Sequence, residues 1–192
     1  MTKRKYFPED MKVQVDEMVV NLRKEFNIML DELDWMDSTT KASAHAKVEQ
    51  MTPHIAYSKE ILDTDLMNQF YKGLSLKSDS FLTNNLKLKK FILAYYSKEF
   101  RQPIDKQSWK THGGAAIVNA FYSPNENSIQ FPAGILDGLF FQADRPAYMN
   151  YGAIGMVVGH EITHGFDDTG SQRDGQGRAY INKEAINIDK II

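Results

Sequence analysis

The beginning of the chain carries apolar residues at the spacing of an α-helix. Between residues 10 and 34 they recur every three or four positions, with charged residues between them. This pattern predicts a long amphipathic helix whose apolar stripe packs on a core. The residues of the stripe are Met11, Val15, Met18, Val19, Leu22, Phe26, Met29, Leu30 and Leu33.

Further helical patterns are expected up to about residue 100. Side-chain oxygens in the stretch Asp37-Ser38-Thr39-Thr40 can cap a second helix, which would run to about Met51 and be stopped by Pro53. Residues 63–74 and 80–100 carry two more stripes of Leu, Phe and Tyr among Lys and Asn. None of these segments has residues at catalytic spacing, so core packing accounts for the stripes.

After Pro103 the pattern changes to that of strands. Residues 116–122 are β-prone, residues 123–127 have the composition of a turn, and residues 128–131 run back, which together predict a β-hairpin. An exposed edge strand can bind an extended peptide by strand addition, and the amide of Asn119 could add to that recognition. The same pattern also fits an ordinary structural hairpin.

The last helical pattern begins near Ala147. Its residues at helical spacing are Met149, Ala153, Met156, Val157, His160 and His164. A helix this apolar before His160 is expected to be buried, so the two histidines should face a dry cleft where unliganded polar groups are costly. Glycines at positions 152, 155 and 159 are expected to allow close approach of neighbouring backbone.

The end of this helix carries the most informative motif, Gly159-His160-Glu161-Ile162-Thr163-His164-Gly165-Phe166-Asp167-Asp168. Residues four apart share a helix face, so His160 and His164 can supply two ligands of a tetrahedral zinc ion, with Glu161 as a general base. A chance spacing on a solvated helix is the alternative. If the helix continues past Gly165, Asp168 could accept a hydrogen bond from a ligating histidine.

Composition limits the other possibilities. The chain has 192 residues, 42% of them hydrophobic, and a net charge of −2, which gives no basic footprint for nucleic acid or an anionic membrane. It has no cysteine, so a metal must be held by His, Asp or Glu. The first residues are charged rather than apolar, so no signal peptide or membrane span is expected, and the start reads as internal to a larger protein.

Several motifs, in their order and spacing from about residue 10 to about 178, resemble the neprilysin / endothelin-converting-enzyme family of zinc metallopeptidases. They are Trp35-Met36-Asp37 with Thr40-Lys41, Asn119-Ala120-Phe121-Tyr122, Phe131-Pro132-Ala133-Gly134-Ile135-Leu136, Asn150-Tyr151-Gly152, Gly155-Met156-Val157 and the stretch from Gly159 to Asp168. The resemblance implies a mainly α fold with a small β-hairpin or sheet, that of a thermolysin-like zincin catalytic domain, here incomplete. It divides the chain into a helical portion (1–105), a substrate-strand hairpin with the HExxH helix (106–178) and an aberrant or truncated tail (179–192).

The resemblance also implies an activity. It is that of a zinc-dependent metalloendopeptidase, cutting peptides on the amino side of large apolar residues, with one zinc ion held by His160 and His164. Glu161 would take a proton from the attacking water and later protonate the leaving amine. The family acts mostly at the cell surface or outside the cell, so the expected partners are peptides, with a membrane reached only through an anchor absent from this chain.

Substrate contacts are implied in the same way. Asn119 and Ala120 would bind the substrate backbone, while Phe140 and Val157 would line the apolar specificity pocket. Asn119, Ala120 and Val157 lie in the motifs quoted above, and Phe140 lies between two of them.

The chain departs from the family at its end. The family's third zinc ligand, a glutamate in an E-x-x-x-D motif, is expected beyond residue 192, and two histidines with water make a poor catalytic zinc site. Glu184 follows His164 by 20 positions, a thermolysin-like spacing, and is the internal substitute. The chain is therefore expected to be inactive alone, and the alternative function is a catalytically dead, peptide-binding fragment.

Overall fold

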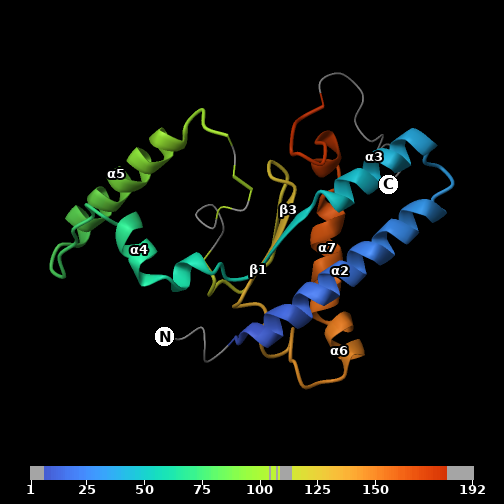
Figure 1. Ribbon diagram of the computed structural model, residues 1–192, viewed down its shortest axis with the longest axis horizontal. Coiled ribbons are helices and arrows are strands. Elements are labelled where there is room, and N and C mark those ends of the chain that lie inside the picture. Colours follow the sequence, from blue (N-terminus) through green and yellow to red (C-terminus); the bar gives the residue numbers. More distant parts are fainter. Residues whose placement is uncertain (1–6, 104, 107, 109–113, 181–192) are drawn as a thin grey trace. The chain divides into compact units, whose positions relative to one another are not determined.

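The computed structural model describes residues 7–103, 105–106, 108 and 114–180, which form two compact units (Figure 1). The first unit takes its described residues from Met1–Tyr57 and Lys110–Ile192, and the second takes them from Ser58–Trp109. Helices dominate both units and the described strands form one small sheet, which confirms the predicted fold class. The division at residues 105 and 178 remains a prediction, and most of the tail, residues 181–192, lies outside the described residues.

Two helices open the first unit. α2 (Glu9–Glu32) lies within two residues of the predicted bounds at each end and buries Val15, Met18, Val19 and Leu30. α3 (Ser38–Glu49) packs against α2 and begins at the predicted cap. There the Asp37 carboxylate accepts a hydrogen bond from the backbone N–H of Thr40 at 2.7 Å, which satisfies a donor that has no partner inside the helix.

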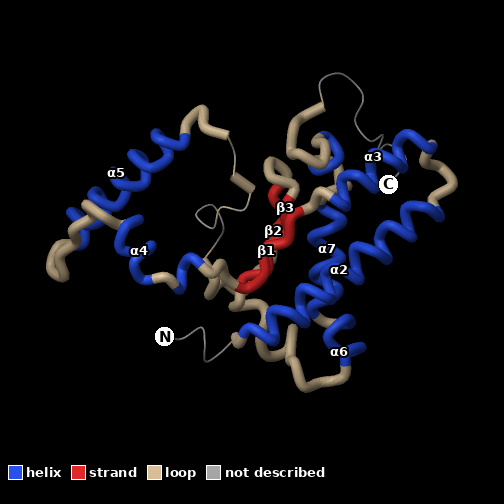
Figure 2. The backbone as a smooth tube through the Cα atoms, in the orientation of Figure 1, coloured by secondary structure: helices blue, strands red, loops and turns tan. Residues whose placement is uncertain are grey.

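The sheet joins segments that lie far apart in the sequence (Figure 2). Its central strand, β3 (Ser128–Pro132), pairs in parallel with β1 (Thr52–Ala56) and antiparallel with β2 (Phe121–Ser123). β2 and β3 form the predicted hairpin, although the first strand begins at Phe121 rather than near residue 116. The side chains of Ile129 and Phe131 are fully buried, so β3 forms the core of this unit.

β1 is a strand that the sequence pattern did not predict. α3 ends at Glu49, two residues before the expected end at Met51, and Pro53 lies inside β1. Proline cannot donate a ladder hydrogen bond, so it is confined to edge strands and bulges. Among the described strands β1 pairs only with β3 and forms an edge, which explains how Pro53 is accommodated.

The helix expected from Ala147 onwards consists of two helices. α6 (Ala147–Gly152) and α7 (Ile154–His164) meet at Ala153, whose φ of −102° and ψ of −89° leave the helical region. α7 packs against α2, α6 and β2 and buries Ile154, Val158 and Ile162. The predicted close approach of backbone is wrong at Gly152 and Gly159, where an added Cβ atom would meet nothing within 4 Å.

The second unit contains the short 3-10 helix η1 (Glu60–Leu62) and the helices α4 (Thr64–Phe70) and α5 (Phe81–Glu99). The ring of Phe70 contacts the rings of Phe91 and Tyr95 on α5, with centroids 5.8 Å and 5.5 Å apart. Aromatic contacts of this kind add to the stability gained from area burial and fix how the two helices pack. In the described ranges of the chain, no helix is both long enough and apolar enough to cross a membrane.

Substitution Ile129→Ala should lower the free energy of unfolding of the chain by about 3 kcal/mol, because it removes a fully buried side chain from the central strand and leaves a cavity. Urea unfolding followed by circular dichroism measures this change. The matched control is Ile28→Ala on α2, where the side chain is 44% exposed and a loss below about 1 kcal/mol is expected. Equal losses for the two variants would contradict a core centred on β3.

Candidate active site

The two histidines of the motif lie one turn apart on α7. Their ring centroids are separated by 4.4 Å and the ring planes are inclined at 77°. His160 is exposed, and the side chain of His164 keeps 43% of its surface exposed. The expectation of a dry cleft around the pair is therefore wrong, because the buried side of α7 is formed by its aliphatic residues while solvent reaches both imidazoles.

Glu161 occupies a different environment on the same helix turn. It is 5% exposed, whereas its neighbour His160 is exposed. Burial raises the pKa of the Glu161 carboxyl, and the charges of His164 and His160 act in the opposite direction. A carboxyl group with a raised pKa can both accept and return a proton, which is the property required of a general acid-base catalyst.

Asp167 orients the imidazole of His164. Nδ1 of His164 donates a hydrogen bond to Oδ2 of Asp167 at 2.7 Å. Oδ1 of Asp167 accepts the backbone N–H groups of Thr169 and Gly170 at 3.0 Å and 2.7 Å. Burial acts to raise the pKa of Asp167, but the hydrogen bonds from Gly170, His164 and Thr169 outweigh it and leave this pKa below its ordinary value.

This contact corrects the assignment of Asp168. That assignment required the helix to continue, but α7 ends at His164 with Gly165 as its C-cap, and Asp168 is exposed beyond it. The carboxylate on His164 belongs to Asp167 instead. Because an ionised carboxylate can only accept, the proton of a neutral His164 ring resides on Nδ1, and Nε2 carries the lone pair that a metal would use.

The donor set fits part of a zinc site. Two imidazoles one turn apart, one of them oriented by a carboxylate, are the nitrogen ligands that zinc accepts. Within residues 7–103, 105–106, 108 and 114–180, no three His, Asp or Glu side chains gather where they could hold a metal together. Glu184, the candidate substitute for a third ligand, lies outside the described residues.

Asn119 and Ala120 directly precede the edge strand β2. Asn119 is exposed, and its Oδ1 accepts the backbone N–H of Ala120 at 3.0 Å, while Ala120 itself is buried. In the described sheet β2 pairs on one side only, with β3, so its other edge is available for an added strand. β2 also contacts α7, which brings this edge to the helix that carries the histidines.

The other two predicted substrate residues are Phe140, whose backbone is bonded to the start of α7, and Val157, which lies on α7 itself. Phe140 is 37% exposed, and its carbonyl oxygen accepts hydrogen bonds from the backbone N–H of Ile154 and from Nη2 of Arg145. Val157 is half-buried on α7, three residues before His160 and hence on the same side of the helix. The backbone of residue 140 is thus fixed to the N-terminal end of the helix.

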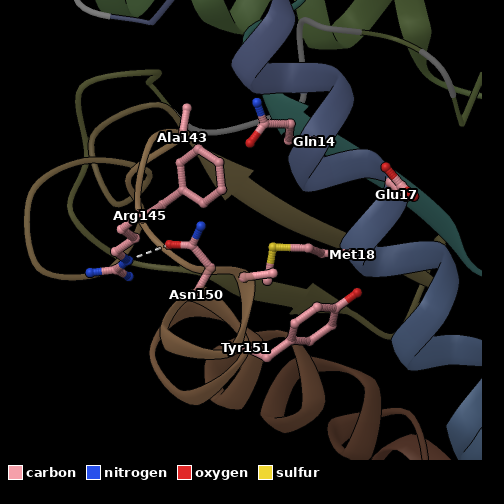
Figure 3. Close-up of a pocket in the computed structure, with 9 residues that line it drawn as sticks. Gln14, Glu17, Met18, Ala143, Arg145, Asn150 and Tyr151 are labelled. Carbon is pink, nitrogen blue, oxygen red and sulfur yellow. Dashed lines mark hydrogen bonds between the residues drawn. The ribbon is translucent and has the colours of Figure 1, made fainter.

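A separate cavity of about 210 Å³ lies between α2 and residues 141–151 (Figure 3). The side chain of Asn150 holds one side of this cavity together, because it makes hydrogen bonds with Arg145 and with the backbone N–H and carbonyl groups of Gln142. None of the residues that line the cavity belongs to α7, so it is distinct from the histidine pair. They are Gln14, Glu17, Met18, Phe141, Ala143, Arg145, Ala147, Asn150 and Tyr151.

Lys47 is a structural contributor that the sequence reasoning missed. It is 1% exposed on α3, and its Nζ donates to the carbonyl oxygens of Gly170 at 2.6 Å and Arg173 at 2.7 Å. Burial lowers its pKa to about 8, opposed by the charges of Asp174 and Asp167. A signal was present in the sequence, because Lys47 falls between Ala44 and Val48 on the apolar stripe of a helix, where a solvated lysine does not belong.

Comparison with known proteins gives a consistent result. Models of "Peptidase family M13" match residues 1–58 and 119–190. Neprilysin-2 of Drosophila melanogaster is 49% identical over 173 residues, and human neprilysin is 42% identical over 165 residues. These alignments cover 90% and 85% of this chain but 22% of each relative.

Solved structures agree. Zinc metalloprotease ZMP1 of Mycobacterium tuberculosis, in complex with an inhibitor, superposes with a TM-score of 0.78 at 34% identity, covering 89% of this chain and 25% of that one. PepO from Lactobacillus rhamnosis gives a TM-score of 0.81 at 31% identity, covering 92% of this chain and 27% of that one. The chain thus spans about a quarter of the length of the proteins it matches.

The pKa of Lys47 predicts a particular pH dependence of stability. The unfolded chain keeps its proton on Lys47 up to about pH 10.5, whereas the folded chain releases it near pH 8, so the unfolded state holds more protons between these values. The unfolding free energy should therefore rise with pH across this window, by at most about 3 kcal/mol, relative to that of Lys47→Met. Urea unfolding of both proteins from pH 7 to 10.5 measures the difference, and a constant difference would refute it.

Proposed function

Because this chain belongs to peptidase family M13, we propose that it provides the zinc-binding helix and the substrate-binding strand of a zinc-dependent metalloendopeptidase. The observation that carries the proposal is the arrangement on α7. Two solvent-accessible imidazoles lie one turn apart, one is oriented by Asp167, and the carboxyl group of Glu161 is buried beside them. The two imidazoles would supply nitrogen ligands for a metal ion, and the carboxyl group of Glu161 would carry a proton beside that ion.

His160 and His164 would hold the zinc ion, His164 through Nε2 because Nδ1 is engaged by Asp167. A bound zinc ion would lower the pKa of a water molecule and polarise the carbonyl group of the peptide bond. Asp167 fixes the ring orientation and the tautomer of His164, which raises the basicity of the ligating nitrogen. A third protein ligand would come from outside the described residues, and Glu184 is the candidate within this sequence.

Glu161 would move the proton. Its carboxylate accepts a proton from the water that attacks the peptide carbonyl, and the resulting carboxylic acid returns that proton to the nitrogen of the leaving amine. The raised pKa of Glu161 supports this role, since it stabilises the protonated form between the two transfers. The charges of His164 and His160 both act on the pKa of Glu161, which supports a carboxyl group close to the two imidazoles.

The substrate would be a peptide bound in extended form along the edge of β2. Asn119 and Ala120 would bind its backbone, and Phe140 and Val157 would accept a large apolar side chain, so that cleavage falls on the amino side of that residue. In the described sheet β2 pairs only with β3, and it contacts α7, which supports binding of an extended peptide beside the histidine helix. Such an enzyme would act on peptides at the cell surface or outside the cell.

Glu161→Gln should reduce hydrolysis of a peptide with an internal Phe or Leu by about 10²–10⁴-fold without loss of zinc, because the amide cannot carry the proton. Hydrolysis is measured by mass spectrometry of the products with a longer protein that contains this chain, because the 192 residues are expected to be inactive alone. Zinc content is measured in parallel. Cleavage should occur before the Phe or Leu.

His164→Ala should abolish stoichiometric zinc binding, whereas His45→Ala should leave it unchanged, since the ring of His45 bonds Asn27 and Asp31 on α2. If a longer protein that contains this chain also bound no zinc and hydrolysed no peptide, the proposal would be refuted. Tight peptide binding without turnover, unaffected by Glu161→Gln, would instead favour a catalytically dead peptide-binding fragment.

A further inference from the structure

The ammonium group of Lys47 connects α3 to the loop that follows the histidine helix. Its two hydrogen bonds go to the carbonyl oxygens of Gly170 and Arg173, at the two ends of the loop's 3-10 helix η3 (Gly170–Gln172). The same ammonium group lies 5.6 Å from the ring centroid of Phe166. A buried ammonium group that lost these partners would cost free energy, so its contacts favour the one position of the loop that provides them.

The peptide group that Lys47 holds is in turn bonded to Asp167. The carbonyl oxygen of Gly170 accepts from Lys47, while the N–H of the same peptide, that of Ser171, donates to the backbone carbonyl oxygen of Asp167 at 3.0 Å. One peptide earlier, the N–H of Gly170 donates to Oδ1 of the Asp167 side chain at 2.7 Å. A peptide polarised at its oxygen becomes a better donor at its nitrogen, so the bonds reinforce one another.

A second anchor holds the same loop from the hairpin turn. Asn127, fully buried, donates through Nδ2 to the carbonyl oxygens of Lys47 and Gly175 at 2.9 Å and 3.0 Å. The hydroxyl of Tyr122 donates to Oδ1 of Asn127 at 3.1 Å. The loop is therefore fixed to α3 by Lys47 and to β2 and β3 by Asn127, and the backbone of Lys47 joins the two anchors.

From this network we infer that Lys47 is a positioning residue for the zinc ligand His164, acting through the Gly170–Ser171 peptide and the carboxylate of Asp167. The inference rests on the proposed role of His164 as a zinc ligand. Lys47 lies on α3, 123 positions before Gly170 in the sequence. The orientation of the His164 imidazole would therefore depend on a residue of the N-terminal helical part of the chain.

The test compares Lys47→Met, which keeps the length of the side chain and removes the donor, with the wild-type chain. Zinc affinity, measured by competition with a chelator, should fall about tenfold, the lower end of the effect of groups that orient a metal ligand. In the metal-free chain, the ¹⁵N signals of His164 should move from the Nδ1-protonated tautomer towards a mixture of tautomers. The signals of His160 should not move.

Two controls separate positioning from general damage to the fold. Lys41→Met removes a lysine on the same helix that also donates to a backbone carbonyl, that of Asp31, and it should leave both readouts unchanged. In the background of Asp167→Asn, adding Lys47→Met should weaken zinc binding by less than about twofold, because groups in one chain of interactions are not additive. If Lys47→Met does not fold, Lys47→Gln, which removes the ammonium group and shortens the side chain while leaving it polar, is measured with the same expected losses.

A tenfold loss from Lys47→Met that persists in the Asp167→Asn background would overturn the inference, and so would unchanged His164 signals in folded Lys47→Met. If neither the wild-type chain nor a longer protein that contains it binds zinc, the proposed function fails, but the tautomer of His164 in the metal-free chain still decides whether Lys47 positions it.

Discussion

The end of helix α7 at His164 is the constraint on which the arrangement around the histidine pair depends. The last carbonyl groups of a helix lack partners within it, and water, side chains or a tight turn of the following chain can satisfy them. Beyond α7 the chain turns back closely at Gly170, where an added Cβ atom would lie 2.0 Å from the carbonyl oxygen of His164, a space that only glycine fits. This tight return brings Asp167 under the imidazole and exposes Asp168.

One helix turn therefore presents two environments. His160 faces solvent, where a metal and a substrate can reach it, while Glu161 is turned into the unit, where burial raises its pKa. The difference follows from the 100° rotation between neighbouring residues of a helix, with the aliphatic residues of α7 fixing which side faces the core. Adjacent residues in the sequence can thus take the roles of ligand and proton carrier without competing for one environment.

Local patterns predicted much of this structure. The helical stripes, the cap at Asp37 and the hairpin follow from periodicity and turn chemistry, which act over a few residues. β1 was missed because its strand character comes from pairing with β3, and Pro53 looked only like a helix stop. Asp167 and Lys47 were missed for a similar reason: their roles depend on where the loop after α7 returns, and only tertiary contacts determine that. The pair His160 and His164 could be found because both lie within one helix.

The parallel pairing of β1 with β3 has a consequence for how the chain acquires this structure. The whole second unit lies between these strands in the sequence, so the sheet cannot close until Pro132 has left the ribosome. The contacts of α4 with α5 are local by comparison and carry a smaller loop-closure entropy. The contacts between α4 and α5 can therefore form during synthesis before the sheet closes, while the apolar stripe of α2 still lacks its contacts with α7. Apolar surface that stays exposed during this interval is prone to aggregation.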